Sequence, residues 1–206
     1  MGSKGMFALA ASVVFGAASM ASASVVVFTQ YDVWAAFSDD MGNPFIASED
    51  FAGYNGFIAN GETGDIGGIS WTASAEGGLY ADGALTYFST NAAGVELVFT
   101  FGEGVMGVGG NFFGTFADFS VAPSIVEVSL NDGTSYFASI SAADQFVGFY
   151  SLGASITGIA VDVADAALGE PPVFSTVDNL YIAIPSPASM ALLGVAGLVA
   201  RRRRRN

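Results

Sequence analysis

Short alternations of apolar and polar residues run through the middle of the chain, each broken after a few positions by glycine, asparagine, aspartate or proline. The clearest break is Asn131-Asp132-Gly133 between segments 124–130 and 134–140, which predicts a β-hairpin. Further strands are expected at 24–29, 68–75, 84–90, 95–101, 105–116, 145–150, 155–163 and 173–184. Regularly spaced short strands of this kind predict an all-β fold, a single jelly-roll-like antiparallel β-sandwich.

Two features interrupt this β pattern. Tyr31, Trp34 and Phe37 recur at helical spacing within 30–38, which predicts one short N-terminal helix whose aromatic stripe packs on the core. Glycine is dense at 61–68 and 102–114, which indicates bulges and close backbone crossings. A nucleotide-binding loop is disfavoured there, because no lysine is available and no helix is expected to follow.

The first 23 residues have the organisation of a secretory signal. Lys4 precedes an apolar stretch at 6–20, and Ala21-Ser22-Ala23 forms a small-residue cleavage site in which Ala21 and Ala23 are the defining positions. The alternative, an N-terminal transmembrane helix, is disfavoured because the apolar stretch is short. We therefore expect residues 1–23 to be a signal peptide and the domain that follows to be exported.

The C-terminal residues form a second unit, expected to span 184–206. Pro185, Ser186 and Pro187 precede an uncharged stretch at 188–200, which as a helix would be about 20 Å long against a bilayer core of about 30 Å. Arg201, Arg202, Arg203, Arg204 and Arg205 follow it. These cations predict a short C-terminal transmembrane helix whose end stays cytoplasmic. The alternatives are a buried core helix with a basic tail, or a nucleic-acid-binding arm.

Charge is divided sharply between the ends and the middle. All six basic residues lie at Lys4 and in the terminal arginine cluster, so the net formal charge changes from −13 for the whole chain to −19 for 24–184. Such a domain repels nucleic acid and attracts cations. The acidity predicts either a solvated surface or Ca²⁺ held by oxygen ligands, although no EF-hand spacing occurs. Zinc and copper sites are disfavoured because the chain has neither His nor Cys.

The tail resembles the PEP-CTERM sorting domain of bacterial exported proteins. The resemblance rests on Pro185-Ser186-Pro187, the apolar stretch and the arginine cluster, with Ser186 where that family usually has Glu. It implies recognition and cleavage near the motif by an exosortase, after passage through the secretion translocon and transient insertion into the inner membrane. The protein would then reach the cell surface or the extracellular space.

The expected domain at 24–183 resembles, more loosely, jelly-roll sandwich domains of surface proteins. The resemblance rests on Phe146-Val147-Gly148-Phe149-Tyr150, the strand at 155–163 and Val177-Asp178-Asn179-Leu180-Tyr181. It implies that an extracellular polysaccharide is a candidate partner and that a structural Ca²⁺ is a candidate cofactor.

Few residues of this domain offer recognisable chemistry. Asp178 and Asn179 are expected either to fix a turn or to offer oxygens to a cation or ligand. Five aromatic residues are candidates for stacking on a sugar, with core packing as the alternative for each: Trp34, Tyr54, Trp71, Tyr80 and Tyr87. Trp71 is the one we single out as a ligand residue.

Catalysis is not expected from this composition. Most general-base and nucleophile arrangements are missing without His, Lys, Arg or Cys in the domain, and no catalytic residue is assigned. The sequence therefore predicts a non-enzymatic surface or extracellular-matrix protein. The alternative is a carbohydrate-binding module, stabilised by Ca²⁺ in one version.

Overall fold

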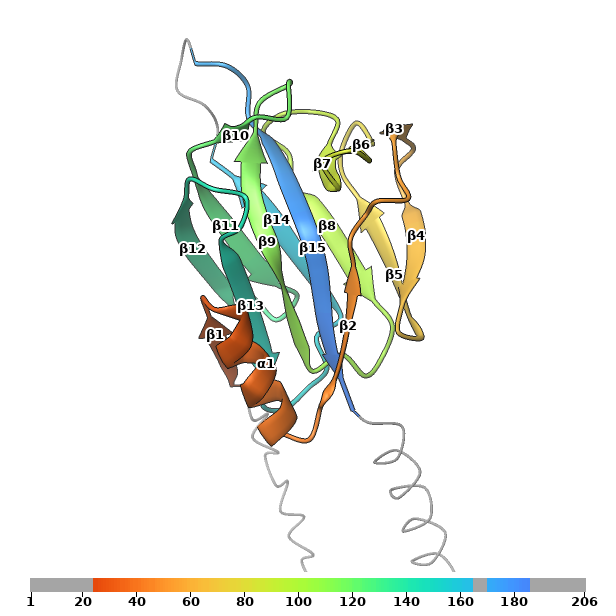
Figure 1. Ribbon diagram of the computed structural model, residues 1–206, viewed down its shortest axis with the longest axis vertical. Helices are drawn as coiled ribbons and strands as arrows, with labels where there is room; N and C mark the ends of the chain where they lie inside the picture. Colours follow the sequence, from red (N-terminus) through yellow and green to blue (C-terminus); the bar gives the residue numbers. More distant parts are fainter. Residues whose placement is uncertain (1–23, 165–169, 186–206) are drawn as a thin grey trace, which may run out of the picture.

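The computed structural model describes residues 24–164 and 170–185, which form two antiparallel β-sheets facing each other and one α-helix (Figure 1). The prediction of an all-β sandwich with one short N-terminal helix is confirmed at this level. Helix α1 (Tyr31–Asp40) contacts strand β13 and lies against the lower part of one sheet in Figure 1.

The larger sheet, sheet A, has nine strands, and α1 packs against it. Its main path is, in spatial order, β1 (Val25–Phe28), β13 (Phe146–Ser151), β9 (Gly107–Thr115), β15 (Phe174–Ile184), β7 (Tyr87–Thr90), β6 (Leu79–Asp82) and β3 (Gly56–Ile58). Two more strands pair outside this path: β2 (Phe45–Glu49) with β15, and β10 (Val121–Ala122) with β9.

The smaller sheet, sheet B, has six strands. In spatial order they are β12 (Ser135–Ile140), β11 (Ser124–Leu130), β14 (Gly158–Val163), β8 (Leu97–Phe101), β5 (Ile69–Ser74) and β4 (Glu62–Ile66). The predicted hairpin joins β11 to β12: Gly133 has a positive φ of 87°, and the Asp132 carboxylate accepts a hydrogen bond from the backbone N–H of Thr134. Such a φ suits glycine, so the sequence placed this turn correctly.

Aromatic side chains fill the space between the sheets. Phe51 stacks on Phe88 with ring centroids 4.9 Å apart, and Trp71 and Phe99 of sheet B meet Phe88 edge-on or tilted. Burial of rings of this size supplies most of the driving force for a domain without cysteine. This core therefore stabilises the domain without any disulfide bond.

Five strands were missed by the sequence pattern: β2, β3, β4, β6 and β10. They are short, and β4 carries Glu62, Gly64 and Asp65, which have low strand propensity. Pairing with neighbouring strands compensates for that low propensity, and a single-sequence pattern does not contain this information. Strand β15 also reaches Ile184, the first residue of the expected tail.

The expected signal peptide and the tail from Ser186 onward lie outside the described residues. Among the residues that the structure does describe, no helix has the length and apolar character needed to cross a membrane.

A pair of glycines lies beneath α1. Gly109 and Gly148 are cross-strand partners, and a Cβ on Gly109 would lie 2.5 Å from the Phe146 ring. A Cβ on Gly148 would meet both Phe146 and Trp34 at under 3 Å. The dense glycines of β9 thus let an aromatic layer lie close to the sheet, which agrees with the expectation of close approaches.

Candidate functional site

The side chains of sheet A divide between a face toward sheet B and a face away from it. Val177 of β15 is the cross-strand partner of both Phe88 and Phe112, and Phe88 contacts rings of sheet B, so these three side chains face inward. Successive side chains of a strand point to opposite faces. Their neighbours, including Thr176 and Ser89, therefore face outward. We call the side that carries α1 the outer face of sheet A.

Asp178 and Asn179 lie at a β-bulge in the middle of β15. Strand β15 pairs with β9 along its length, and the register shifts between Asp178 and Leu180. On its other edge β15 pairs with β7 at Thr176 and Val177 and with β2 from Leu180 onward. Asn179 adopts a φ of 55°, which asparagine tolerates better than most residues. The bulge thus marks the point where β15 changes partners.

Two other strained residues lie beside this bulge. Thr86, with a φ of 61°, has its hydroxyl 3.0 Å from Asp178 Oδ1. Phe51 has a φ of 56°. It follows Asp50, whose negative charge helps to raise the pKa of Asp178. Non-glycine residues in this backbone region are held there by their surroundings, and such residues gather at functional sites more often than elsewhere.

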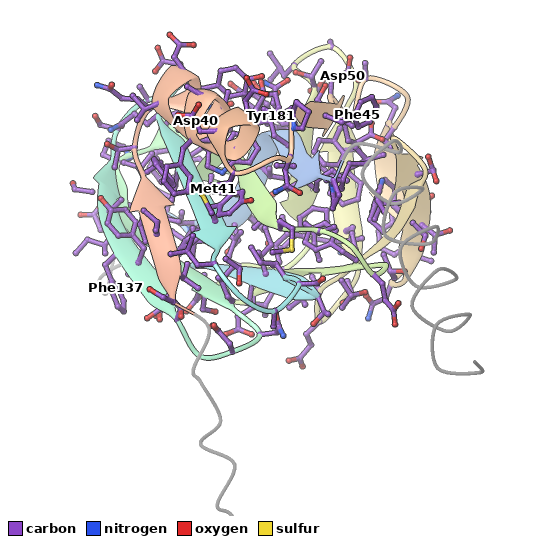
Figure 2. All side chains as sticks on the ribbon, turned by 90° about the horizontal axis from the view of Figure 1, so that it is seen from below. Asp40, Met41, Phe45, Asp50, Phe137 and Tyr181 are labelled. Atoms are coloured by element: carbon purple, nitrogen blue, oxygen red, sulfur yellow. The ribbon has the colours of Figure 1, made fainter. Side chains whose placement is uncertain are left out.

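Three aromatic rings lie next to the bulge. Tyr31 of α1 lies 4.8 Å from Tyr181 of β15 and 5.7 Å from Phe146 of β13, measured between ring centroids. Figure 2 shows Tyr181 beside the helix, between it and the segment that carries Phe45 and Asp50. The three rings therefore come from three separate segments and form one wall.

These groups line a hollow of about 400 Å³, which we call the acidic hollow. It is lined by three aromatic rings, two carboxylates, two amides and one alanine: Tyr31, Phe146, Tyr181, Asp144, Asp178, Asn111, Asn179 and Ala143. An apolar wall opposite a few polar groups is typical of small-molecule sites.

Burial controls the electrostatics of the hollow. It raises the pKa of Asp178 above its ordinary value, and the nearby charge of Asp50 adds to the rise. Hydrogen bonds from Thr86 and from the backbone of Asn179 act in the opposite direction without cancelling it. Burial also raises the pKa of Tyr181, with Tyr31 and Asp178 contributing. Both shifts follow from placing ionisable groups where water is partly excluded.

Asp178 and Asn179 lie in the interior of β15, within the strand expected at 173–184. The backbone of Asn179 hydrogen-bonds the Asp178 carboxylate, a contact between adjacent residues of the strand. In addition, both residues line the acidic hollow, which leaves their side chains available to a ligand.

The structure contradicts the assignment of Trp71. It was singled out as a ligand residue, but it is 1% exposed in the core, and its indole N–H has no hydrogen-bond partner. A ligand on the surface does not reach it. Trp34 is also fully buried, with Nε1 donating to the carbonyl of Phe149 at 3.0 Å. Of the five stacking candidates, Tyr80 is the exposed one.

The acidic residues do not assemble into a metal site in the described part of the chain. Across 24–164 and 170–185, no group of three or more Asp or Glu side chains is arranged to hold an ion. The Ca²⁺ prediction therefore gains no support from the geometry of Asp178.

Six residues of the acidic hollow were not proposed as ligand residues from the sequence: Tyr31, Asn111, Ala143, Asp144, Phe146 and Tyr181. Tyr31 was assigned to a helix stripe and Tyr181 to a strand, both correctly. One signal was available for Tyr181, because it lies in the same strand and only three residues beyond Asp178. Nothing in the sequence connects Asn111 or Asp144 to it.

No family model, curated protein or solved structure matches the chain. The functional argument therefore rests on the residues of this structure.

Proposed function

We propose that this chain is an exported, non-enzymatic surface or matrix protein that binds carbohydrate in the acidic hollow. In this proposal its C-terminal tail is a sorting signal read by an exosortase, and the sandwich belongs to the jelly-roll class. The jelly-roll assignment is supported by connections that cross between sheets, as from β8 to β9 and from β12 through β13 and β14 to β15.

The observation that carries the binding proposal is the juxtaposition of Tyr31 and Tyr181 with Asp178 in one hollow. A sugar ring has apolar C–H faces and a polar edge of hydroxyl groups. The negative face of an aromatic ring suits the first, and carboxylate and amide oxygens accept hydrogen bonds from the second. Since no described residue is basic, anionic glycans would be repelled, and neutral or amino sugars are favoured.

Export and sorting are supported by where the domain begins and ends. Val25 of β1 is the partner of Ser151, and the adjacent Tyr150 is the partner of Gly107. Gly107 in turn is the partner of Ala183 near the end of β15. Both ends therefore lie at one pole of sheet A, three strand spacings or roughly 14 Å apart. A tail at that pole would leave the other pole facing away from the membrane.

Binding is tested on a glycan array that carries neutral, amino and anionic glycans. We expect neutral or amino glycans to bind, Tyr31→Ala to remove the signal, and Ile125→Ala, an exposed position on sheet B, to leave it unchanged. The absence of binding, or binding unaffected by Tyr31→Ala, contradicts this site. Because Asp144 and Asp178 share the hollow, the bound glycan is also assayed for hydrolysis. Turnover that Asp178→Asn abolishes would contradict the non-enzymatic part.

Sorting is tested separately by intact mass spectrometry of the protein released by its own cells. We expect a form that ends near residues 185–188 and lacks the five C-terminal arginines. A released form that retains Arg201 to Arg205 contradicts processing by an exosortase.

A further inference from the structure

A second hollow, of about 300 Å³, lies on sheet A beyond the bulge. We call it the neutral hollow, because none of the described residues that line it carries a charge. Its lining includes three aromatic rings, two hydroxyl side chains and one amide: Tyr80, Phe119, Phe174, Ser89, Thr115 and Asn91. Its chemistry therefore differs from that of the acidic hollow.

One wall of the neutral hollow is built by a fixed turn. Phe119 has a φ of 62° and lies against the exposed Tyr80, with ring centroids 5.7 Å apart. The backbone N–H of Phe116 donates to the carbonyl of Ser120 at 2.9 Å. The Asp118 carboxylate accepts hydrogen bonds from the Ser120 backbone and hydroxyl at 3.0 and 2.6 Å. These bonds hold Phe119 in a conformation that a bulky side chain rarely adopts.

The two hollows share the same pair of strands. Asn111 of β9 lines the acidic hollow and Thr115 lines the neutral hollow, so the two positions are roughly 14 Å apart along the strand. Between them the hydroxyl of Thr176 lies 2.7 Å from that of Thr115 and 2.9 Å from that of Ser89. The strands that form the floors of both hollows are thus tied together by a buried hydroxyl network.

We propose that a linear, uncharged polysaccharide crosses this face and occupies both hollows, an inference that rests on the carbohydrate-binding function proposed above. The neutral hollow presents aromatic rings for the C–H faces of a sugar and the exposed amide of Asn91 for its hydroxyls, while the buried hydroxyls of Ser89 and Thr115 hold its floor. It offers no cation to an anionic chain. The span between the hollows requires a ligand longer than one sugar unit, so a polymer is favoured over a free monosaccharide.

The test measures affinity by calorimetry for two neutral series, cello- and malto-oligosaccharides, from the dimer to the hexamer. For one series we expect affinity to rise roughly tenfold or more with length, because the second contact becomes intramolecular. Tyr80→Ala should remove this rise without changing dimer affinity, and Tyr80→Phe should retain it. Phe137→Ala, an exposed aromatic truncation on β12 of sheet B, is the matched control.

The outcomes separate the two proposals. Affinity that does not depend on length, or a Tyr80→Ala variant that behaves like the control, overturns the two-hollow inference and leaves the acidic hollow standing. Binding that is sensitive to Tyr80→Ala but unchanged by Tyr31→Ala overturns the acidic hollow as the site and confines the sugar to the neutral hollow. If no oligomer of either series binds, the neutral-polysaccharide inference is overturned, and the glycan array decides the acidic hollow.

Discussion

The hydroxyl of Thr86 lies between two acceptors, 3.0 Å from Asp178 Oδ1 and 2.5 Å from the carbonyl oxygen of Leu85. A hydroxyl has one proton to donate, so it serves one of them at a time. When the proton goes to Leu85, the contact with Asp178 is a hydrogen bond only if Asp178 is itself protonated. When the proton goes to Asp178, the hydrogen bond lowers the pKa of that carboxyl, but burial, the larger cause, still raises the pKa above its ordinary value.

The raised pKa predicts that Asp178→Asn stabilises the protein at neutral pH. The unfolded carboxyl titrates near pH 3.9, and the folded one titrates above that value, so ionised Asp178 destabilises the native state. This penalty is fully present above the folded pKa and disappears as the pH falls through it toward about 3.9. The melting temperature of the variant should exceed that of the wild type at pH 7 and converge with it below about pH 4.

Asp118→Asn is the control of opposite sign, because hydrogen bonds from Ser120 lower the pKa of Asp118. Its ionised form stabilises the native state, and this contribution is lost as the pH falls through the folded pKa. The variant should therefore be less stable at pH 7 and approach the wild type in acid. If the stability difference from the wild type did not change with pH in either variant, the pKa shifts assigned to Asp178 and Asp118 would be contradicted.

Thr86→Val tests the contact itself. The substitution keeps the branched shape and removes the hydroxyl, so we expect the free energy of unfolding to fall by about 1 kcal/mol. Since the Thr86 hydrogen bond lowers the pKa of Asp178, its loss should raise that pKa further. Denaturant unfolding measures the first effect and NMR titration of the Asp178 carboxyl carbon the second. An unchanged titration would show that the hydroxyl does not serve Asp178.

Gly148→Ala tests the close packing beneath α1. The new Cβ would lie 2.7 Å from Phe146 and 2.9 Å from Trp34, so a loss of about 1–3 kcal/mol in the free energy of unfolding is expected. Gly53→Ala is the matched control, because its Cβ would meet nothing within 4 Å. Equal effects of the two variants in denaturant unfolding would contradict this role for Gly148.

Trp34→Phe tests the docking of α1 on sheet A. The change removes the hydrogen bond from Nε1 to the carbonyl of Phe149 and leaves that buried oxygen without its donor, at a cost of about 1–3 kcal/mol. Val33→Ala, at a half-exposed neighbouring position of the same helix, should cost much less. Thermal unfolding followed by near-UV circular dichroism compares them, and a Trp34→Phe variant as stable as Val33→Ala contradicts the docking role.

The charge of the domain predicts a response to salt. With nineteen acidic residues and no basic residue in 24–184, repulsion opposes folding, and added NaCl should raise the melting temperature by screening it. Because no described group of three acidic side chains could hold an ion, CaCl₂ at matched ionic strength should do no more, and EDTA should change nothing. A fall in the melting temperature with EDTA would instead indicate a bound divalent cation.

The candidate site was only partly accessible from the sequence. Asp178 and Asn179 are visible in the sequence as a polar pair in an apolar strand, but the sequence does not show the bulge at which they lie, where β15 changes partner from β7 to β2. Trp71 was misassigned because alternation shows that a side chain points to one face of a strand without showing whether another sheet covers that face. Here β5 turns Trp71 toward Phe51 and Phe88.

The β class, the β11–β12 hairpin, helix α1 and the acidic composition could be predicted from the sequence, because each follows from local periodicity, turn chemistry or residue counts. Tertiary structure decided which aromatic rings are core and which are surface, and it brought Tyr31, Asp144 and Asp178 to one hollow. These residues come from distant segments. Their proximity depends on which strands pair and in what register, and that choice is fixed by long-range packing.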